Sequence, residues 1–226
     1  MSAFSSLTTT SVLQAFSQEI ALHEGSVRDT FDDGERLFVR SVLPRVKEVR
    51  TGDRLQGGVA LRACDGQVWV HPYVFRLVCK NGAIMAHAVT SRHVVVTSEH
   101  DLEVVHEAVR ECCADEVFAT SFDEIRSARD IHADMALNLL PLLSRLRGHG
   151  SERLLQEIMR RFFDDGDRTR FGFMNAVTSV ARDTADPETK WKLEELGGGV
   201  PAQSIRSNPK KPARGSAAAR EPVLAS

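Results

Sequence analysis

The sequence predicts an α+β fold: an antiparallel β-meander followed by a packed set of α-helices, with a disordered basic C-terminal tail. Two observations lead to this prediction. Apolar residues alternate at strand periodicity over the longest stretch between about residues 52 and 96, where turn residues interrupt them at short intervals. After residue 101 they recur at intervals of three and four, which is typical of amphipathic helices. Because the helices follow the sheet and do not alternate with its strands, the pattern indicates α+β architecture.

The 226 residues are enough for one sizeable domain. We expect a flexible, Ser/Thr-rich N-terminus at residues 1–9 and a single α+β domain at residues 10–200. Within that domain the sheet is expected at about 35–97 and the helical part at about 101–197. Residues 201–226 are rich in Pro, Ser, Ala, Lys and Arg and are expected to form a disordered tail.

The first expected elements are a helix and a strand. Apolar residues recur at helical spacing from Thr10, and Gly25 is a typical helix stop. Residues 32–34 form a turn, and alternation over residues 35–43 predicts a first strand.

The meander follows. Strands are expected at residues 55–63, 68–79 and 83–89, with a candidate further strand at 93–97. Asp65-Gly66 and Asn81-Gly82 supply two-residue hairpin turns, since Asp, Asn and Gly tolerate positive φ. The second strand is apolar on both faces, which predicts a central position, whereas Pro72 within it favours an edge or a bulge.

Helices are then expected at about residues 101–118, 122–147, 151–163, 169–183 and 187–196. Pro141 is a candidate kink in the second of these helices. Residues 164–167 are expected to end the third helix, and the three glycines at 197–199 to end the last one.

Composition narrows the class of protein. An apolar content of 42% and a charged content of 27% are ordinary for a globular protein, and no apolar run approaches the roughly 18 residues of a membrane span. Four cysteines lack CxxC spacing and no signal peptide precedes the chain, which favours reduced thiols and a cytoplasmic location. The net charge of −2 combines an acidic body with a basic tail containing Lys210 and Lys211, a segment that either solubilises the chain or attracts an acidic partner.

Motifs for metals, cofactors and catalysis are missing. The eight histidines include pairs six residues apart, which fits neither an i, i+4 ligand pair nor HExxH, so we expect no metal. Residues 164–167 lack the ligand pattern of a calcium loop, and the glycines at 197–199 lack the context of a nucleotide motif, so we expect no cofactor. No triad follows from spacing; catalytic residues stay unassigned and the expectation leans against an enzyme.

Arg76 is the unusual residue of the meander. It shares a face with Val74 and Val78, and a buried arginine needs a partner or a ligand. A structural ion pair and a contact to an anion or phosphate are the two alternatives. Further Lys and Arg residues make the first half of the sheet locally basic, which is typical of either a solvated strand face or a groove for a polyanion.

Four segments resemble one family. The run HPYVFRLVCKNGAIMAHAVTSRHV is similar to the core of the bacterial, plasmid- and phage-associated family called domain of unknown function 932, with Phe75 in place of its tyrosine. GDRLQGGVALRACDG, RTRFGFMNAVTSVARD and LEELGGGV resemble its flanking segments. The matching positions are Pro72, Arg76, Cys79, Asn81, Gly82, Arg92, His93, Thr169, Gly172, Asn175, Thr178, Glu194, Gly197 and Gly198. The resemblance implies a cytoplasmic mobile-element protein acting near DNA, and it supplies no reaction.

Three functional hypotheses follow. The leading one is non-enzymatic binding of nucleic acid, with single-stranded DNA as the candidate ligand and contacts from Arg62, Arg76, Lys80, Asn81, Arg92 and His93. It requires these side chains to share one surface. The second is an oligomeric scaffold or partner-binding protein, with subunit contacts from Phe162, Phe163 and the helix around Asn175. The third is an enzyme in which Arg76, Asn81 and His93 meet Asn175 in a polar pocket, which Thr178 would also line.

Overall fold

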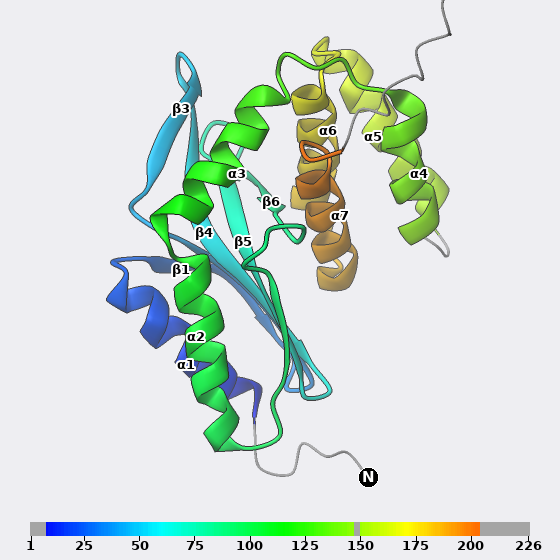
Figure 1. Ribbon diagram of the computed structural model, residues 1–226. Helices are drawn as coiled ribbons and strands as arrows, with labels where there is room; N and C mark the ends of the chain where they lie inside the picture. Colours follow the sequence, from blue (N-terminus) through cyan, green and yellow to red (C-terminus); the bar gives the residue numbers. More distant parts are fainter. Residues whose placement is uncertain (1–7, 147–149, 204–226) are drawn as a thin grey trace, which may run out of the picture.

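The computed structural model describes residues 8–146 and 150–203 (Figure 1). The strands of this part of the chain are β1 (Ser26–Asp32), β2 (Arg36–Val42), β3 (Val46–Arg50), β4 (Asp53–Cys64), β5 (Gln67–Arg76), β6 (Asn81–Ile84) and β7 (Arg92–Val95). Its α-helices are α1 (Thr9–Leu22), α2 (Leu102–Cys112), α3 (Asp115–Ser127), α4 (Met135–Arg145), α5 (Ser151–Asp165), α6 (Arg170–Arg182) and α7 (Pro187–Gly199). A short 3₁₀ turn, η1 (Glu99–Asp101), precedes α2.

All strand pairs within the described residues are antiparallel, and the predicted α+β fold is confirmed. The strand order is β1-β2-β4-β5-β6, with β3 also paired to β4 and β7 also paired to β5. The predicted turn at Asp65-Gly66 is confirmed, since both residues have positive φ (50° and 73°) and join β4 to β5. This long hairpin is the centre of the sheet.

Pro72 lies in β5 without breaking a ladder. It faces Val59 of β4, while on the other edge of β5 the pairing with β7 covers Gln67–Val70 and the pairing with β6 begins only at Tyr73. The missing N–H therefore falls in the gap between two short partner strands. A central strand and an internal proline, which conflict in the sequence, are both accommodated.

Helices cover both faces of the sheet (Figure 1). On one face, α1 and α2 bury alternate residues of the strands, such as Val39, Val59 and Val70. On the other face, Trp191 of α7 packs against Phe38 and its neighbours. A third group of apolar side chains joins α3, α5 and α6 to the far end of β4 and β5. Because side chains alternate between the two faces of each strand, the sheet contributes apolar residues to the packing on both faces.

The glycines near the end of α7 lie inside the helix, so the predicted stop at residue 197 is wrong. A Cβ on Gly198 would lie 2.0 Å from the carbonyl oxygen of Ile84, and one on Gly197 would lie 2.5 Å from the methyl group of Thr178. The glycines allow α7 to pack directly on β6 and α6.

Several sheet predictions need correction. The sheet starts at residue 26 and not at about 35, since it includes β1, which was not predicted. Strand β3 was also missed. β1 is exposed along its whole length, so it lacks the apolar alternation that signals a strand. Asn81-Gly82 is not the turn; residues 77–80 are, with Lys80 at a φ of 53°, and Asn81 begins β6. The predicted strand at 83–89 ends at Ile84.

Two predicted helix boundaries are also wrong. The expected helix at 101–118 is interrupted at Ala114, which is extended, because α2 packs on the α1 side of the sheet whereas α3 packs with α5 and α6. The expected helix at 122–147 is likewise split, and Asp134 caps a new helix, α4, which contains Pro141. Helices α5, α6 and α7 begin within one residue of their predicted positions.

The N-terminal helix begins at Thr9 with Thr8 as its cap, one residue before its predicted start. Residues 1–7 and 204–226, on which most of the expected flexible N-terminus and basic tail fall, lie outside the described residues. None of the helices within the described ranges combines the length and the apolar character that crossing a bilayer requires.

Candidate functional site

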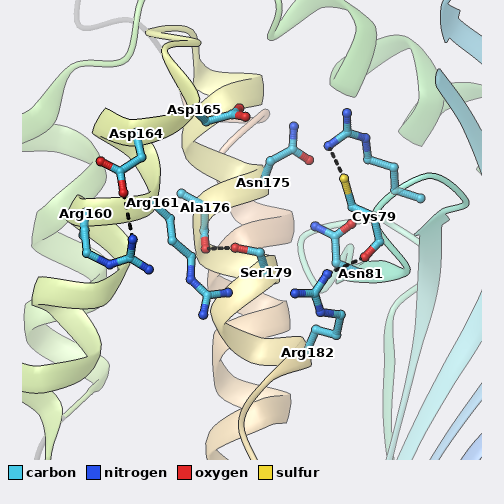
Figure 2. Close-up of a pocket in the computed structure, with 11 residues that line it drawn as sticks. Cys79, Asn81, Arg160, Arg161, Asp164, Asp165, Asn175, Ala176, Ser179 and Arg182 are labelled. Carbon is cyan, nitrogen blue, oxygen red and sulfur yellow. Dashed lines mark hydrogen bonds and ion pairs between the residues drawn. The ribbon is translucent and has the colours of Figure 1, made fainter. Parts of the chain in front are cut away.

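A cleft of about 410 Å³ lies where the end of the β5–β6 pair meets α5 and α6, and we call it the asparagine cleft. Its lining residues are Arg76, Cys79, Asn81, Arg160, Arg161, Asp164, Asp165, Asn175, Ala176, Ser179 and Arg182. Figure 2 shows side chains of α5 on one side, Cys79 and Asn81 on the other, and Asn175 and Ser179 of α6 between them. Residues more than 90 positions apart in the sequence therefore meet here.

Arg76 ends β5 and is buried. Its Nε and Nη2 donate to the two carboxylate oxygens of Asp53, both at 2.7 Å, and Nη1 donates to Sγ of Cys79 at 3.2 Å. The guanidinium also lies 5.2 Å from the ring centre of Phe171. Burial disfavours its charged form, but the hydrogen bonds and charge of Asp53 outweigh that effect and raise the pKa of Arg76. The structural ion pair, one of the two alternatives, is thus present, and the same side chain borders the cleft.

The two asparagines present unsatisfied acceptors. Nδ2 of Asn81 donates to Oγ1 of Thr178 at 2.5 Å, and that hydroxyl donates to the carbonyl oxygen of Met174 at 2.9 Å. Oδ1 of Asn81 and Oδ1 of Asn175 are both buried and have no hydrogen-bond partner among the described residues. A buried acceptor without a partner costs about 1–3 kcal/mol, so each is a point where a donor from a ligand would be favourable.

Two arginines of α5 border the opposite side of the cleft. Nε and Nη2 of Arg160 and Nε of Arg161 donate to the carboxylate of Glu157 at 2.9, 2.7 and 2.7 Å. These hydrogen bonds lower the pKa of Glu157 to about 2. The carboxylate therefore stays ionised and orients both guanidinium groups.

Arg182, the last residue of α6, ties that helix to the sheet. Its Nη1 donates to the carbonyl oxygen of Cys79 at 2.7 Å, and its Nε and Nη2 donate to the carboxylate of Asp183 at 2.8 and 3.0 Å. Hydrogen bonding from Arg182 lowers the pKa of Asp183 to about 2, against a smaller opposing effect of burial. The contact therefore joins α6 to the turn before β6 at the border of the cleft.

The charge of the cleft is nearly balanced. Its lining contains four arginines and two aspartates, an excess of two positive charges. Three further carboxylates, those of Asp53, Glu157 and Asp183, bond to these arginines from just outside the lining. Counting them gives a formal charge of −1, so the cleft offers rigidly held donors and not a strong positive potential.

Two of the six proposed nucleic-acid contacts lie at the other end of the β4–β5 hairpin. The ring of His93 stacks on Trp69, with centroids 4.8 Å apart and planes within 7°, and Arg62 lies 4.8 Å from the Trp69 ring centre. Arg62 also forms an ion pair with Glu188 at 3.0 Å. This stack is partly exposed and far along β5 from the asparagine cleft.

The six contacts do not share one surface. Arg92, next to His93, points to the opposite face of the sheet and pairs with Glu111 of α2 at 2.6 Å. Lys80 is exposed in the turn before β6. Only Arg76 and Asn81 border the asparagine cleft, so the continuous groove that the leading hypothesis requires is not formed by these six side chains.

The polar pocket of the enzyme hypothesis is assembled in part. Arg76, Asn81 and Asn175 border the same cleft, and Thr178 holds Asn81 in place, but His93 is elsewhere. Sequence reasoning missed Cys79, the polar residues of α5, and Ser179 and Arg182 of α6 as parts of a site. The available signal was the run of charged residues on α5 opposite its apolar face, which alone does not show that α5 lies beside β5.

The residues proposed for subunit contacts differ in exposure. Phe162 is buried in the helical core, whereas Phe163 is 51% exposed. Among the described residues, no group of three or more His, Cys, Asp or Glu is arranged to hold a metal ion.

Comparison with known proteins gives one family and no named relative. No curated protein and no solved structure matches the chain. One family model matches residues 3–195, a span that includes the sheet, the asparagine cleft and most of α7. On that match, the chain belongs to the family described as domain of unknown function (DUF932).

Proposed function

We propose that the chain binds single-stranded nucleic acid without catalysing a reaction, and that one nucleotide of the strand enters the asparagine cleft. The observation that supports this proposal is the pair of buried, unpartnered Oδ1 atoms of Asn81 and Asn175 in a cleft bordered by arginines. Both amide oxygens can accept hydrogen bonds from N–H or O–H donors of a ligand. The guanidinium groups can donate to acceptors or stack on planar rings.

An unpaired nucleotide offers both kinds of group. The Watson–Crick edge of a base carries N–H donors and acceptors, and these are free only in a single strand or a flipped-out nucleotide. Arginine planes stack on bases and donate to phosphate oxygens. The cleft volume of about 410 Å³ lies within the roughly 300–1,000 Å³ of small-ligand sites, which suits one nucleotide and not a duplex.

The exposed stack of Arg62, Trp69 and His93 supports a second, weaker contact. Aromatic and guanidinium planes at a surface bind bases with little sequence preference. Because the stack and the cleft lie at opposite ends of β5, one nucleic-acid strand would have to span the length of β5 to contact both.

Labelled single-stranded and duplex DNA should be titrated into the full chain at low and moderate salt. Asn175→Ala removes one unpartnered acceptor, and Asn138→Ala, which changes another buried helical asparagine far from the cleft on α4, is the matched control. We expect about tenfold weaker single-strand binding for Asn175→Ala and no change for Asn138→Ala. A third variant, with Lys210 and Lys211 both changed to Gln, measures how much of the binding comes from the basic tail and not from the cleft.

Equal binding by Asn175→Ala and the unchanged chain would overturn the cleft as the site. Loss of binding only with the two lysine changes would assign binding to generic attraction by the tail. No binding of any nucleic acid would favour the scaffold, for which exposed Phe163 is the specific observation. Light scattering of Phe163→Ser against the unchanged chain would then test an oligomer.

A cytoplasmic location and a role in phages or plasmids are part of the same proposal. All four cysteines are unpaired, which suits a reducing compartment. Nucleic acid would be the natural partner of a mobile-element protein.

A further inference from the structure

A second cleft, of about 220 Å³, lies on the α7 side of the sheet, and we call it the Arg40 cleft. It adjoins the asparagine cleft, since Asn81 and Arg182 border both. Its other charged and hydroxyl-bearing residues are Arg28, Asp29, Arg40, Tyr73, Lys80, Lys190 and Glu194, from β1, β2, β5, the turn before β6 and α7.

The Arg40 cleft is basic. Five cationic side chains and two carboxylates border it. Arg182 also bonds to Asp183 from outside the lining, so the formal excess is two positive charges. Each carboxylate is already bonded to a cation of the cleft: Glu194 accepts from Arg40, and Asp29 accepts from Lys190, both at 2.6 Å.

Two cations at its mouth remain uncompensated. Arg28 and Lys80 are exposed, and neither has a carboxylate partner among residues 8–146 and 150–203. The guanidinium of Arg28 lies 4.1 Å from the ring centre of Phe75, which holds it over the β5 side of the cleft. The asparagine cleft, in contrast, has carboxylates bonded to each of its arginines.

Arg40 has a hydrogen-bond donor without a partner at the floor of the Arg40 cleft. The residue is only 3% exposed; its Nε donates to Glu194 and its Nη1 donates to Asp29 at 3.4 Å. Its Nη2 is buried with no hydrogen-bond partner in the described part of the chain. A buried guanidinium N–H without an acceptor is costly, and an anion in the cleft would satisfy it.

Tyr73 places a hydroxyl in the same cleft. A Cβ on Gly82 would lie 1.8 Å from the Tyr73 hydroxyl oxygen, so only glycine leaves room for the hydroxyl there. Burial, together with the charge of Glu194, raises the pKa of Tyr73 well above its usual value, so the hydroxyl remains a donor at neutral pH.

We propose that the Arg40 cleft binds a tetrahedral oxyanion of phosphate type, with Arg40 and Tyr73 as donors at its floor and Arg28 and Lys80 at its mouth. The cleft has about half the volume of the asparagine cleft, which suits a single phosphate group. The inference does not rest on nucleic-acid binding: free phosphate, a phosphate monoester and a phosphodiester share this chemistry, and they are separated experimentally.

The test is calorimetric titration of the full chain with sodium phosphate, with sodium sulfate as a second oxyanion and sodium chloride of equal ionic strength as the baseline. Two variants probe the site: Arg28→Ala combined with Lys80→Ala, which removes the exposed cations, and Tyr73→Phe, which removes only the hydroxyl. Arg54→Ala is the matched control, because Arg54 is an exposed arginine of β4 outside the cleft. Thermal melts show that each variant is folded.

We expect saturable phosphate and sulfate binding, weakened about tenfold or more by the double variant and severalfold by Tyr73→Phe, and unchanged by Arg54→Ala. Binding no stronger than the chloride baseline, or equal weakening by Arg54→Ala, would overturn the proposal. A short single-stranded oligonucleotide that displaces phosphate identifies a phosphodiester as the occupant, and failure to displace it identifies free phosphate or a monoester. Asn175→Ala leaves phosphate binding intact in either case, so this proposal and the asparagine cleft can fail separately.

Discussion

Asn81, the first residue of β6, donates a 2.5 Å hydrogen bond to Thr178 of α6, 97 positions later in the chain. The bond joins the sheet to the helical part at the asparagine cleft. Because Thr178 holds the amide nitrogen, the amide oxygen of Asn81 is left as a buried acceptor without a partner among the described residues.

Replacing Thr178 with Val should destabilise the protein. The change keeps the shape of the side chain but leaves Nδ2 of buried Asn81 without a partner, at a cost of about 1–3 kcal/mol. Urea unfolding monitored by circular dichroism measures the loss. Thr178→Ser retains the hydroxyl and should lose clearly less; if Val and Ser variants are equally stable, the hydrogen bond contributes nothing.

Gly198→Ala should be more damaging than Gly199→Ala, although the two glycines are neighbours on α7. The added Cβ at Gly198 would lie 2.0 Å from the carbonyl oxygen of Ile84, and a backbone atom cannot move away cheaply. We expect a loss of about 1–3 kcal/mol or more. At Gly199 nothing lies within 4 Å of the added atom, so Ala should be neutral or stabilising by up to about 1 kcal/mol. Similar melting temperatures for the two variants would contradict the close packing of α7 on β6.

These glycines show what the sequence could predict and what it could not. Asp65 and Gly66 form a hairpin turn because their own backbone preferences demand it, so the centre of the sheet was predictable. Gly198 has the same local preferences but serves a contact with Ile84, which lies in another element. Local signals alone read it as a helix end.

Asn81-Gly82 failed as a turn for a related reason. Asn-Gly is the strongest local hairpin signal, yet here Asn81 bonds to Thr178 and Gly82 makes room for Tyr73, so tertiary contacts place both residues in β6. The turn falls instead at residues 77–80, where Lys80 adopts a positive φ of 53°.

The candidate site was predictable on its sheet side and in part on α6, but not on α5. Arg76 drew attention as an arginine among valines, and Asn81 and Asn175 were named as candidates. Arg160 and Arg161 were not, because no local pattern reports that α5 lies beside β5. Exposed β1 was missed for lack of any apolar alternation.

Asp53→Asn should strongly destabilise the end of the β4–β5 hairpin. Asp53 is 3% exposed and its carboxylate is the bidentate partner of buried Arg76, so the change leaves a buried guanidinium without a counter-charge. We expect a loss of about 3–5 kcal/mol. Asp33→Asn breaks an exposed ion pair in which Nε and Nη2 of Arg36 donate to one carboxylate oxygen, and should have little effect. Chemical denaturation of both variants provides the comparison, and equal small losses would show that the Arg76 pair is dispensable.

His71 should make the protein less stable in mild acid. It is 6% exposed beside Trp191, its Nδ1 has no partner among the described residues, and burial, aided by the charge of His93, lowers its pKa to about 4. In the unfolded chain a histidine titrates near 6.5, so between about pH 6.5 and 4 the unfolded state binds a proton that the folded state does not. The stability is fully present above pH 6.5 and falls as pH drops, by on the order of 3 kcal/mol at pH 4.

His71→Gln removes the titrating group. Between pH 6.5 and 4 the free energy of unfolding of this variant should therefore fall by about 3 kcal/mol less than that of the unchanged chain. Urea unfolding at intervals from pH 7 to 4 measures the slope. His100→Gln changes an exposed histidine of η1 and should leave the slope as it is in the unchanged chain.

Below pH 4 the carboxylates of Glu157 and Asp183, whose pKa values are lowered to about 2, lose their contribution to stability in every variant, so the curves should run parallel there. A His71→Gln curve parallel to that of the unchanged chain between pH 6.5 and 4 would show that the neutral, buried state of His71 does not govern acid sensitivity.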